Sequence, residues 1–260
     1  MDCSETKLYH EHGFCSKSFL ETYFSENSTM VFGDETMKFP IEKMNEMCAS
    51  GDIKGDVLTD ISIGPLIHHL YPMCDIFKQL FLLRFSERCI LELRKWCIDG
   101  TGAFNWSHIQ SIAAGLFGDS KQLETKHALL RSAIKQIVKC HSDREYLTHP
   151  LQLPQADCVS SCWILEVIST DEARYQSNLK KIGDCVKPGG YLLLVGAVNG
   201  TFFTVGNQRM HLFNHNEDFV KDALAKEGFT VIKCEVLQRK AESDLSDYKG
   251  MSFIAARKDK

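Results

Sequence analysis

Residues 187–194 read Lys-Pro-Gly-Gly-Tyr-Leu-Leu-Leu, and this stretch decides how the chain around it folds. Pro188 cannot continue the helical spacing that precedes it, and Gly189 and Gly190 allow backbone angles that other residues avoid. The apolar run at 191–198 is typical of a strand covered on both faces. The stretch therefore predicts a helix, a sharp turn and a buried strand in succession.

Outside this stretch, strand and helix patterns alternate, which predicts an α/β fold: a mostly parallel, seven-stranded sheet with helices on both faces. We expect strands at 57–63, 79–85, 137–142, 157–165, 191–198, 229–237 and 251–257. We expect helices from the Gly64-Pro65 turn to about residue 73 and at 87–98, 106–117, 121–138, 171–186 and 217–227, with an irregular aromatic stretch at 199–213. The first 50 residues do not follow the alternation, so we interpret 1–50 as a helical lid and 51–260 as one α/β domain.

The composition of the 260 residues narrows the class of protein. A net charge of −4 gives no electrostatic reason to expect nucleic acid or an anionic membrane as the main partner. The longest strongly apolar run has eight residues, against the roughly 20 of a membrane helix. Residues 1–14 lack the basic start of a signal peptide. We therefore expect a cytoplasmic protein, and we expect a monomer.

The cysteines and histidines predict no metal site. Eleven cysteines, an odd number without a C-x-x-C pair, are typical of free thiols in a reducing compartment. Cys158 and Cys162 lack the second pair that zinc would need. The remaining candidates are His10-Glu11-His12 and the pair His211 and His215, for which we favour solvated loop histidines over metal ligands.

Several further stretches resemble a known family. They read Phe-Leu-Glu-Thr-Tyr-Phe at 19–24, Gly-Asp-Val-Leu-Thr-Asp-Ile at 55–61, Ala-Phe-Asn-Trp-Ser at 103–107, Pro-Gln-Ala-Asp-Cys-Val at 154–159 and Ala-Ala-Arg-Lys at 255–258. Together with 187–194 they are similar to the methyltransferases that act on nicotinamide, indolethylamine and phenylethanolamine. The resemblance runs nearly end to end. It implies a Rossmann-like class I methyltransferase fold, the cofactor S-adenosyl-L-methionine and a small-molecule amine as substrate.

The resemblance also implies a cofactor site, in which several residues differ from the family pattern. Phe19 and Phe24 stand where the family has a pair of lid tyrosines, and Ser62 and Ile63 alter the loop that usually reads Asp-Ile-Gly-Ser-Gly-Pro. Arg84 replaces the acid that accepts hydrogen bonds from the ribose hydroxyls, although a guanidinium has no acceptor. The complete set of candidate cofactor contacts is Phe19, Phe24, Asp60, Ser62, Ile63, Gly64, His68, Arg84, Phe85, Cys89, His141, Ser142 and Cys162.

The candidate acceptor site comes from the same resemblance. Trp163 and Phe203 stand at family pocket walls, with core packing as the equal alternative, and Gly196 replaces an aspartate of the nicotinamide enzymes. Asp247 matches an acid near the substrate amine and is the candidate catalytic residue, with a strand-capping turn residue as its alternative. Three further residues are favoured as solvent-exposed: Glu166, as a helix-start carboxylate with a hydrogen bond to the substrate as its alternative, and the neighbours His68 and His69.

These observations favour an S-adenosylmethionine-dependent N-methyltransferase with an altered cofactor pocket. The alternative is a catalytically inactive relative with weak or no cofactor binding, because the substitutions fall on the pocket and spare the scaffold. A third interpretation takes Arg84 as a ligand for the 2′-phosphate of a dinucleotide. The loop at 60–65 lacks the three-glycine spacing of such sites, which counts against it.

Overall fold

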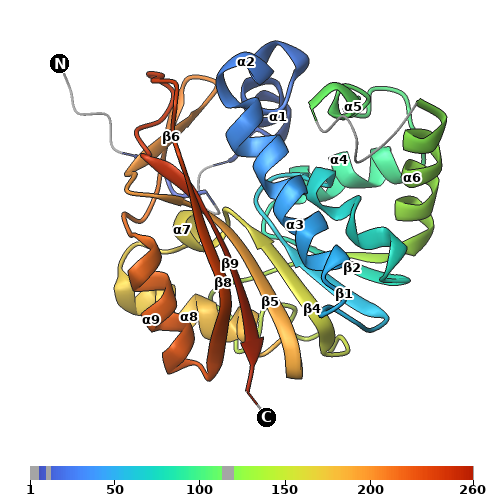
Figure 1. Cartoon of the computed structure of the whole chain (residues 1–260). Coiled ribbons are helices and arrows are strands. Elements are labelled where there is room, and N and C mark those ends of the chain that lie inside the picture. Colours follow the sequence, from blue (N-terminus) through green and yellow to red (C-terminus); the bar gives the residue numbers. More distant parts are fainter. Residues whose placement is uncertain (1–5, 10–12, 113–119, 260) are drawn as a thin grey trace.

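The computed structural model describes residues 6–9, 13–112 and 120–259. Its main feature is a seven-stranded sheet in the order β3-β2-β1-β4-β5-β9-β8 (Figure 1). The strands are β1 (Val57–Ile61), β2 (Gln79–Arg84), β3 (Ile134–Lys139), β4 (Ala156–Cys162), β5 (Val186–Val198), β8 (Phe229–Gln238) and β9 (Gly250–Lys258). Strands β1 to β5 pair in parallel, and β9 runs antiparallel to both β5 and β8. This confirms the mostly parallel seven-stranded sheet.

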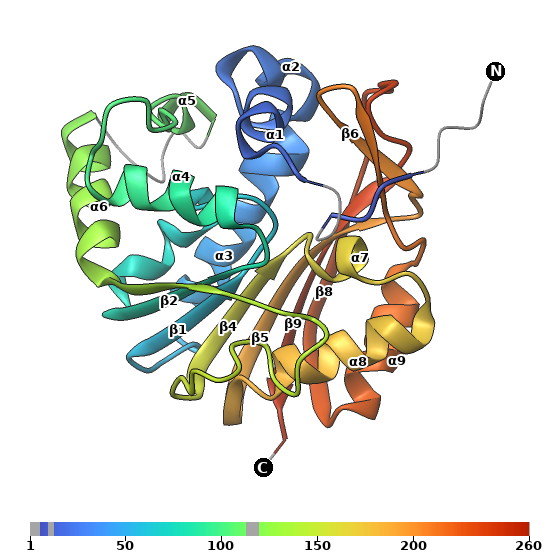
Figure 2. The ribbon, with the colours of Figure 1, turned by 180° about the vertical axis from the view of Figure 1, so that it is seen from behind.

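Helices cover both faces of this sheet. In Figure 1, α3 lies in front of the strands, and in the opposite view of Figure 2, α8 lies in front of them. The helices of the α/β part are α4 (Glu87–Cys97), α5 (Ile109–Ile112), α6 (Ser120–Ala133), α7 (Leu165–Ile168), α8 (Glu172–Gly183) and α9 (Glu217–Lys226). Asp171 and Asn216 cap α8 and α9 by accepting hydrogen bonds from backbone N–H groups of the first turn.

The described residues 16–49 form a set of helical segments, of which α1 and α2 lie near the carboxyl ends of the parallel strands and α3 lies over the sheet. They are α1 (Ser16–Tyr23), the 3-10 turn η1 (Glu26–Ser28), α2 (Thr29–Phe32), the π-helical turn η2 (Gly33–Lys38) and α3 (Phe39–Ala49). At the top of Figure 1, α1 and α2 lie at the same end of the molecule as a two-stranded hairpin, β6 (Phe202–Val205) with β7 (Gln208–His211). This hairpin falls in the stretch for which the sequence predicted only irregular structure.

Two predicted helices were wrong in part. The segment after Gly64-Pro65 forms two short 3-10 turns, η3 (His68–Leu70) and η4 (Met73–Asp75), and Pro72 interrupts any longer helix. The predicted helix at 121–138 ends at Ala133, and Ile134 begins β3 because its residues pair with β2. Of the predicted helix at 106–117, the structure contains α5, and residues 113–117 lie outside the described ranges.

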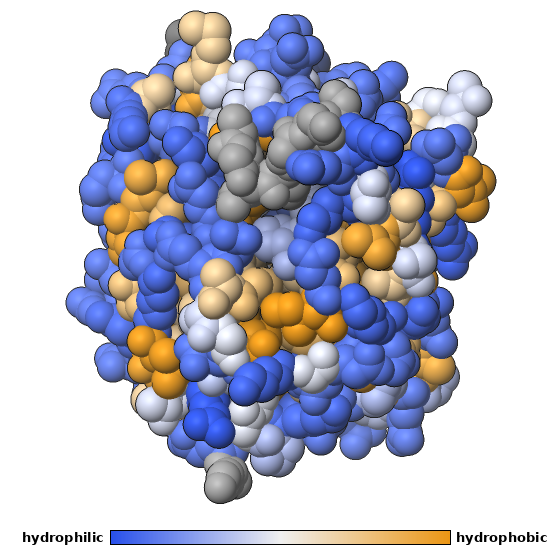
Figure 3. Space-filling model, turned by 45° about the vertical axis from the view of Figure 1, so that its right-hand side comes forward, coloured by the Kyte–Doolittle hydropathy of each residue, from blue (hydrophilic) through white to orange (hydrophobic). Residues whose placement is uncertain are grey.

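The surface and the cysteines show what the sequence predicted: a mainly hydrophilic face and free thiols. One face of the molecule is mainly hydrophilic with separate apolar side chains (Figure 3). No helix in the described ranges is long and apolar enough to cross a membrane. The ten cysteines of these ranges are all free thiols, as predicted, and Cys3 lies outside them.

Candidate functional site

A buried polar network lies at the carboxyl ends of β1 and β2. Asp60 and Arg84 are both fully buried, and Arg84 Nη2 donates to Asp60 Oδ2 at 2.6 Å. Burial alone would raise the pKa of Asp60, but Arg84 and then His69 outweigh it and hold that pKa well below its usual range. The carboxylate is therefore charged and paired inside the protein.

Three more side chains complete the coordination of Asp60. Its Oδ1 accepts hydrogen bonds from Ser62 Oγ at 2.8 Å, Ser160 Oγ at 2.8 Å and His69 Nε2 at 2.7 Å. Ser62 Oγ also accepts the backbone N–H of Cys162 at 3.0 Å. Ser62 thus points into the network rather than toward solvent. The prediction of a surface position for His69 was wrong, since its side chain is fully buried.

The remaining Nη donors of Arg84 are used within the chain as well, whereas its buried Nε–H has no hydrogen-bond partner among the described residues. Nη1 donates to the carbonyl oxygens of Asp60 and Leu83, and Nη2 also donates to the carbonyl of Leu66 at 2.9 Å. A fully buried guanidinium with these partners is already committed. The interpretation of Arg84 as a ligand for a 2′-phosphate therefore has no support in this geometry.

Side chains of the N-terminal region cover the loop after β1. Gly64 has φ +60°, a conformation that favours glycine, and a Cβ there would lie 2.5 Å from Phe19 Cε1. The backbone N–H of Gly64 donates to the hydroxyl of Tyr9 at 3.2 Å, and this hydroxyl lies 3.7 Å from Cys89 Sγ. Tyr9 is 1% exposed. Sequence reasoning missed Tyr9 because it precedes every motif used for the prediction.

His68 lies inside a group of aromatic rings. Its ring stacks on Trp106 with a centroid distance of 5.4 Å, and the ring of Phe24 is 5.2 Å away. Nε2–H donates to the carbonyl of Thr36 at 2.9 Å, which links η3 to the N-terminal helices. Burial lowers the pKa of His68 well below its usual value, so the ring is neutral. The prediction of a surface position was wrong here too.

The other candidate cofactor residues lie at the same edge of the sheet. Phe85 and Cys89 are buried directly after β2 and on α4. His141 and Ser142 follow β3 and are half-buried, and their backbone groups bond to Leu147 O and Lys181 Nζ. Ser62, Arg84 and His141 thus come to one edge, but Ser62 and Arg84 face inward.

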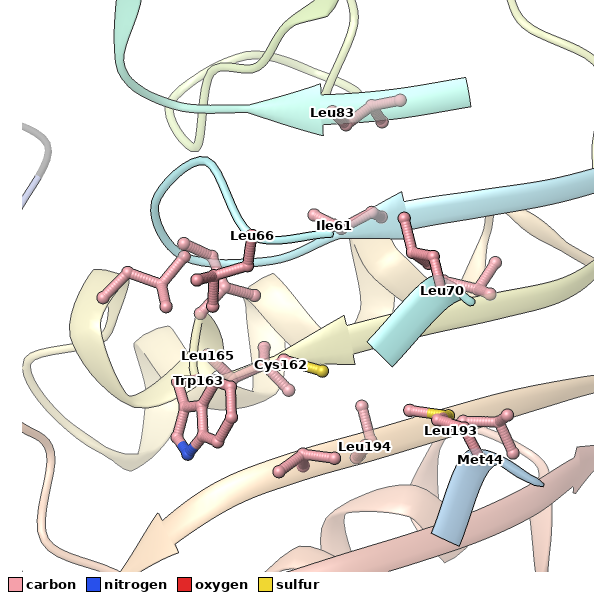
Figure 4. Close-up of a cluster of buried hydrophobic side chains, with 14 of the residues drawn as sticks. Met44, Ile61, Leu66, Leu70, Leu83, Cys162, Trp163, Leu165, Leu193 and Leu194 are labelled. Atoms are coloured by element: carbon pink, nitrogen blue, oxygen red, sulfur yellow. The ribbon is translucent and has the colours of Figure 1, made fainter. Parts of the chain in front are cut away.

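An apolar cavity of about 50 Å³ lies between the N-terminal helices and the sheet. It is lined by Phe19, Tyr23, Phe24, Thr36, Ile63, Trp163, Val167, Ala197, Phe203, Leu212, Tyr248 and Met251. Trp163 directly follows β4 with φ +53°, an uncommon angle for a bulky residue. Figure 4 shows its indole beside Cys162 and Leu165 at the end of this strand. The predicted wall residues Trp163 and Phe203 therefore lie together.

Glu166 is buried on α7 next to the end of β5. Its Oε1 accepts the backbone N–H of Ala197 at 2.8 Å, and a Cβ added at Gly196 would lie 3.3 Å from this oxygen. Burial raises the pKa of Glu166 to about 7. The prediction of a solvated carboxylate was wrong. Glu166 and Gly196 line a second small cavity together with His215.

Asp247 lies outside the apolar cavity. Its carboxylate accepts hydrogen bonds from the backbone N–H groups of Thr201 and Phe202 and from Thr201 Oγ1 at 2.5 Å. Burial alone would raise the pKa of Asp247, but these hydrogen bonds lower it. Asp247 lines an outer pocket, on which Tyr248 also borders. Its geometry is that of a residue that fixes the turn between β5 and β6.

The histidine pairs form no metal centre in the described part of the chain, where no group of three or more metal-ligating side chains occurs. His211 Nε2–H donates to the carbonyl of Ser169, and His215 Nδ1–H donates to that of Phe213. The prediction of a solvated residue was wrong for His215, which is buried against Phe213 and Tyr175. His10-Glu11-His12 lies outside the described residues.

Solved structures of other methyltransferases have the same fold as this chain. A methyltransferase from Clostridium acetobutylicum, described as S-adenosylmethionine-dependent, superposes with a TM-score of 0.57 at 10% identity and covers 95% of this chain and 100% of its own. The 1,6-didemethyltoxoflavin-N1-methyltransferase of Burkholderia thailandensis, solved with S-adenosylhomocysteine, gives 0.56 at 12% identity, over 100% of this chain and 94% of its own. The fold is that of class I methyltransferases.

Sequence comparison gives the family. Indolethylamine N-methyltransferase of Mus musculus is 29% identical over 98% of both chains, and nicotinamide N-methyltransferase of Homo sapiens is 28% identical over 98% of this chain and 95% of its own. Phenylethanolamine N-methyltransferase of Macaca mulatta is 31% identical over 81% of this chain and 76% of its own. The model of the NNMT/PNMT/TEMT family matches residues 3–259. The chain therefore belongs to the NNMT/PNMT/TEMT family.

Proposed function

We propose that this protein is an S-adenosyl-L-methionine-dependent N-methyltransferase that acts on a small amine or N-heterocycle and has an altered donor site. The observation that carries the proposal is the aromatic cavity at the carboxyl edge of the sheet, with Ile63 of the loop after β1 in its wall. Ligands of open α/β sheets bind at this edge. The family membership supplies the class of reaction.

The residues at this edge fit only part of the donor. S-adenosylmethionine supplies a methyl group on a sulfonium, and transfer mainly requires alignment of the acceptor and exclusion of water. The buried Phe85 is suited to ring contacts, and the Gly64 N–H is suited to a backbone contact once it gives up its hydrogen bond to the Tyr9 hydroxyl. The ribose hydroxyls need an acceptor, and Arg84 has none. We therefore expect the donor to bind without the charge-assisted ribose contact, which costs about 1.5–3 kcal/mol.

One observation favours a second candidate function, a family member without methyl transfer. Asp60, Ser62 and Arg84 satisfy one another in a fully buried network. Such a network stabilises the fold without any ligand. A protein that had lost donor binding could keep it unchanged.

Calorimetric titration with S-adenosylmethionine and S-adenosylhomocysteine separates the two candidates. Micromolar binding supports the proposal, and absence of binding up to millimolar concentration contradicts it and supports the second candidate. Gly64→Ala is the test variant, because its Cβ would clash with Phe19. Ile98→Ala changes an exposed side chain after the end of α4, outside the apolar cavity, and is the control. If the donor binds, the protein is mixed with S-adenosylmethionine and with nicotinamide, tryptamine or phenylethanolamine in turn. Methylated product is then detected by mass spectrometry.

We further propose that residues 1–50 act as the lid of the domain formed by 51–260, and that the protein is a cytoplasmic monomer without a nucleic-acid partner. The contacts of Phe19 with Gly64 and of His68 with Thr36 support the lid. The acidic balance and the free thiols support the compartment. Light scattering after size-exclusion chromatography tests the monomer, and a mass of twice 29.5 kDa would contradict it.

A further inference from the structure

The described residues 6–9 lie beside β7 of the hairpin. Lys7 forms a parallel bridge with Met210 of this strand. The N–H of Lys7 donates to the carbonyl oxygen of Arg209, and the carbonyl oxygen of Lys7 accepts the N–H of His211, both at 2.9 Å. Residues 6–9, which we call the strap, are therefore held on the hairpin by two backbone hydrogen bonds.

The last residue of the strap, Tyr9, reaches from the hairpin to the loop after β1. Its side chain is 1% exposed, and its hydroxyl accepts the backbone N–H of Gly64 at 3.2 Å. The Sγ atom of Cys89, on α4, lies 3.7 Å from the same hydroxyl. The hydroxyl thus lies between the loop that follows β1 and the helix that follows β2.

This is the position at which open α/β sheets bind their ligands, at the carboxyl ends of neighbouring strands. The amide of Gly64 has a single hydrogen, and the Tyr9 hydroxyl uses it. A ligand that contacts the loop through this N–H must first displace the hydroxyl. Neither Tyr9 nor Gly64 lines the apolar cavity, so the space in that cavity does not remove the conflict.

Aromatic packing buries the ring of Tyr9. Its centroid lies 4.6 Å from that of Phe14 in an edge-to-face arrangement, and the ring of Phe14 lies 5.1 Å from that of Phe19. Burial raises the pKa of the Tyr9 hydroxyl well above its usual value, so the group is neutral. The chain therefore fills this part of the cleft with an uncharged side chain of its own.

We propose that the strap is autoinhibitory: Tyr9 occupies the place of the donor at Gly64, and S-adenosyl-L-methionine binds only when residues 6–9 leave the hairpin. This inference rests on the proposed function and names a regulation of its donor site. The protein then has a closed form, with Tyr9 inserted, and an open form, with the loop free. The donor binds the open form alone, which raises its apparent dissociation constant by the reciprocal of the open fraction.

The strap can be loosened without loosening α1, although the same hairpin holds both. The hydroxyl of Tyr23, on α1, accepts the N–H of Thr204 in β6 and donates to the carbonyl oxygen of the same residue. These bonds involve neither Lys7 nor β7. A change of the backbone at Lys7 therefore acts on the strap and leaves this anchor of α1 in place.

Lys7→Pro tests the strap, with Lys7→Ala as its matched control. Proline removes the N–H that bonds to Arg209, whereas alanine keeps it, and both changes remove the lysine side chain. Each full-length variant is titrated calorimetrically with S-adenosylhomocysteine. We expect Lys7→Pro to bind it at least about threefold more tightly than Lys7→Ala does. Equal or weaker binding by the proline variant overturns the proposal.

Hydrogen exchange distinguishes a displaced strap from one that folds over the donor. The amides of Lys7 and His211 are the two donors of the bridge, so their exchange reports whether the strap is attached. We expect both amides of the wild type to exchange faster with S-adenosylhomocysteine bound than without it. The amide of Leu192, in the paired centre of β5, is the internal control and should not become faster. Unchanged or slower exchange of the bridge amides overturns the proposal.

The outcomes also separate this proposal from the proposed function. If wild type, Lys7→Ala and Lys7→Pro bind S-adenosylhomocysteine equally, the methyltransferase function stands and the strap is not inhibitory. If none of them binds it up to millimolar concentration, and a folded Tyr9→Ala variant does not either, both proposals are wrong. Binding by Lys7→Pro and Tyr9→Ala alone supports both proposals.

Discussion

Replacement of Arg84 by methionine tests whether this side chain belongs to the fold or to the donor site. Methionine fills much of the same space but removes both the charge and the four hydrogen bonds that Arg84 donates. Asp60 would then be a buried carboxylate whose remaining side-chain partners, within the described ranges, are Ser62, Ser160 and His69. The change therefore breaks an ion pair by removing one partner.

The expected cost is large for a single substitution. Breaking a buried pair in this way costs about 3–5 kcal/mol. For a chain of this size the unfolding temperature falls by about 2–4 °C per kcal/mol, which gives a decrease of roughly 6–20 °C. Arg88→Met is the matched control on the exposed side of α4, with an expected change below about 0.5 kcal/mol. The double variant Asp60→Asn with Arg84→Met should lose less than the sum of the single changes.

Thermal and urea unfolding of these variants provide the measurement. The depressed pKa of Asp60 stabilises the folded protein above the unfolded value near 4, and this contribution is lost as the pH falls below it. The difference between wild type and Arg84→Met should therefore shrink in acid. If Arg84→Met unfolds like Arg88→Met at neutral pH, the ion pair does not form, and Arg84 faces the donor cleft after all.

The same reasoning changes what a return to the family residue would do. Arg84→Asp places a second carboxylate beside Asp60 in a site without exposure to water. We expect it to destabilise the protein at least as much as Arg84→Met does, because like charges repel and both are desolvated. An acid at position 84 alone does not rebuild a ribose site. Combining it with Ser62→Gly also removes a hydrogen bond to Asp60.

Three other predictions follow from buried hydrogen bonds. Glu166→Gln keeps an acceptor for the N–H of Ala197 but cannot ionise. Because the pKa of Glu166 is raised to about 7, the free energy of unfolding of the wild type, measured in urea, should fall by about 2–3 kcal/mol relative to this variant as the pH rises from about 5 to 8. A difference that stays constant with pH would contradict the raised pKa. Tyr248→Phe leaves the Glu35 carboxylate with the N–H of Lys240 as its remaining partner among the described residues. We expect the free energy of unfolding to fall by about 1–3 kcal/mol and hydrogen exchange in η2 to become faster. Unchanged exchange would show that the Tyr248 hydroxyl does not hold η2. Tyr9→Phe frees the Gly64 N–H, and calorimetry should show roughly two- to tenfold tighter S-adenosylhomocysteine binding, whereas weaker binding would make Tyr9 a ligand contact.

The arrangement of the sheet could be predicted because its strands carry strong local signals. The apolar runs at 80–83 in β2 and at 191–195 in β5 appear in the sequence without interruption, and Pro188, Gly189 and Gly190 precede the second run within β5 itself. Errors arose where long-range pairing overrides local preference. The residues 134–138 continue a helical spacing, but they become β3 because β2 offers an open edge for pairing.

The site was harder to predict because its geometry depends on which way side chains turn. The sequence places Arg84 at the end of β2, but its inward direction follows from Asp60, a partner 24 positions earlier. Glu35 and Tyr248 are 213 positions apart and carry no common motif. Glu166 shows the same limit, since only the close packing of Gly196 leaves room for its carboxylate inside the protein. Whether Asp247 acts on a substrate stays a prediction.

The small volume of the apolar cavity has a kinetic consequence. A ligand that needs more room than this cavity offers binds only while wall side chains such as Phe19 and Phe24 are displaced, so its observed affinity is the intrinsic affinity reduced by the fraction of time spent in that state. At high ligand concentration the rate of association should level off at the rate of opening. Substitutions in α1 that never touch a ligand would then change how quickly it enters, while leaving its escape from the open state unaltered.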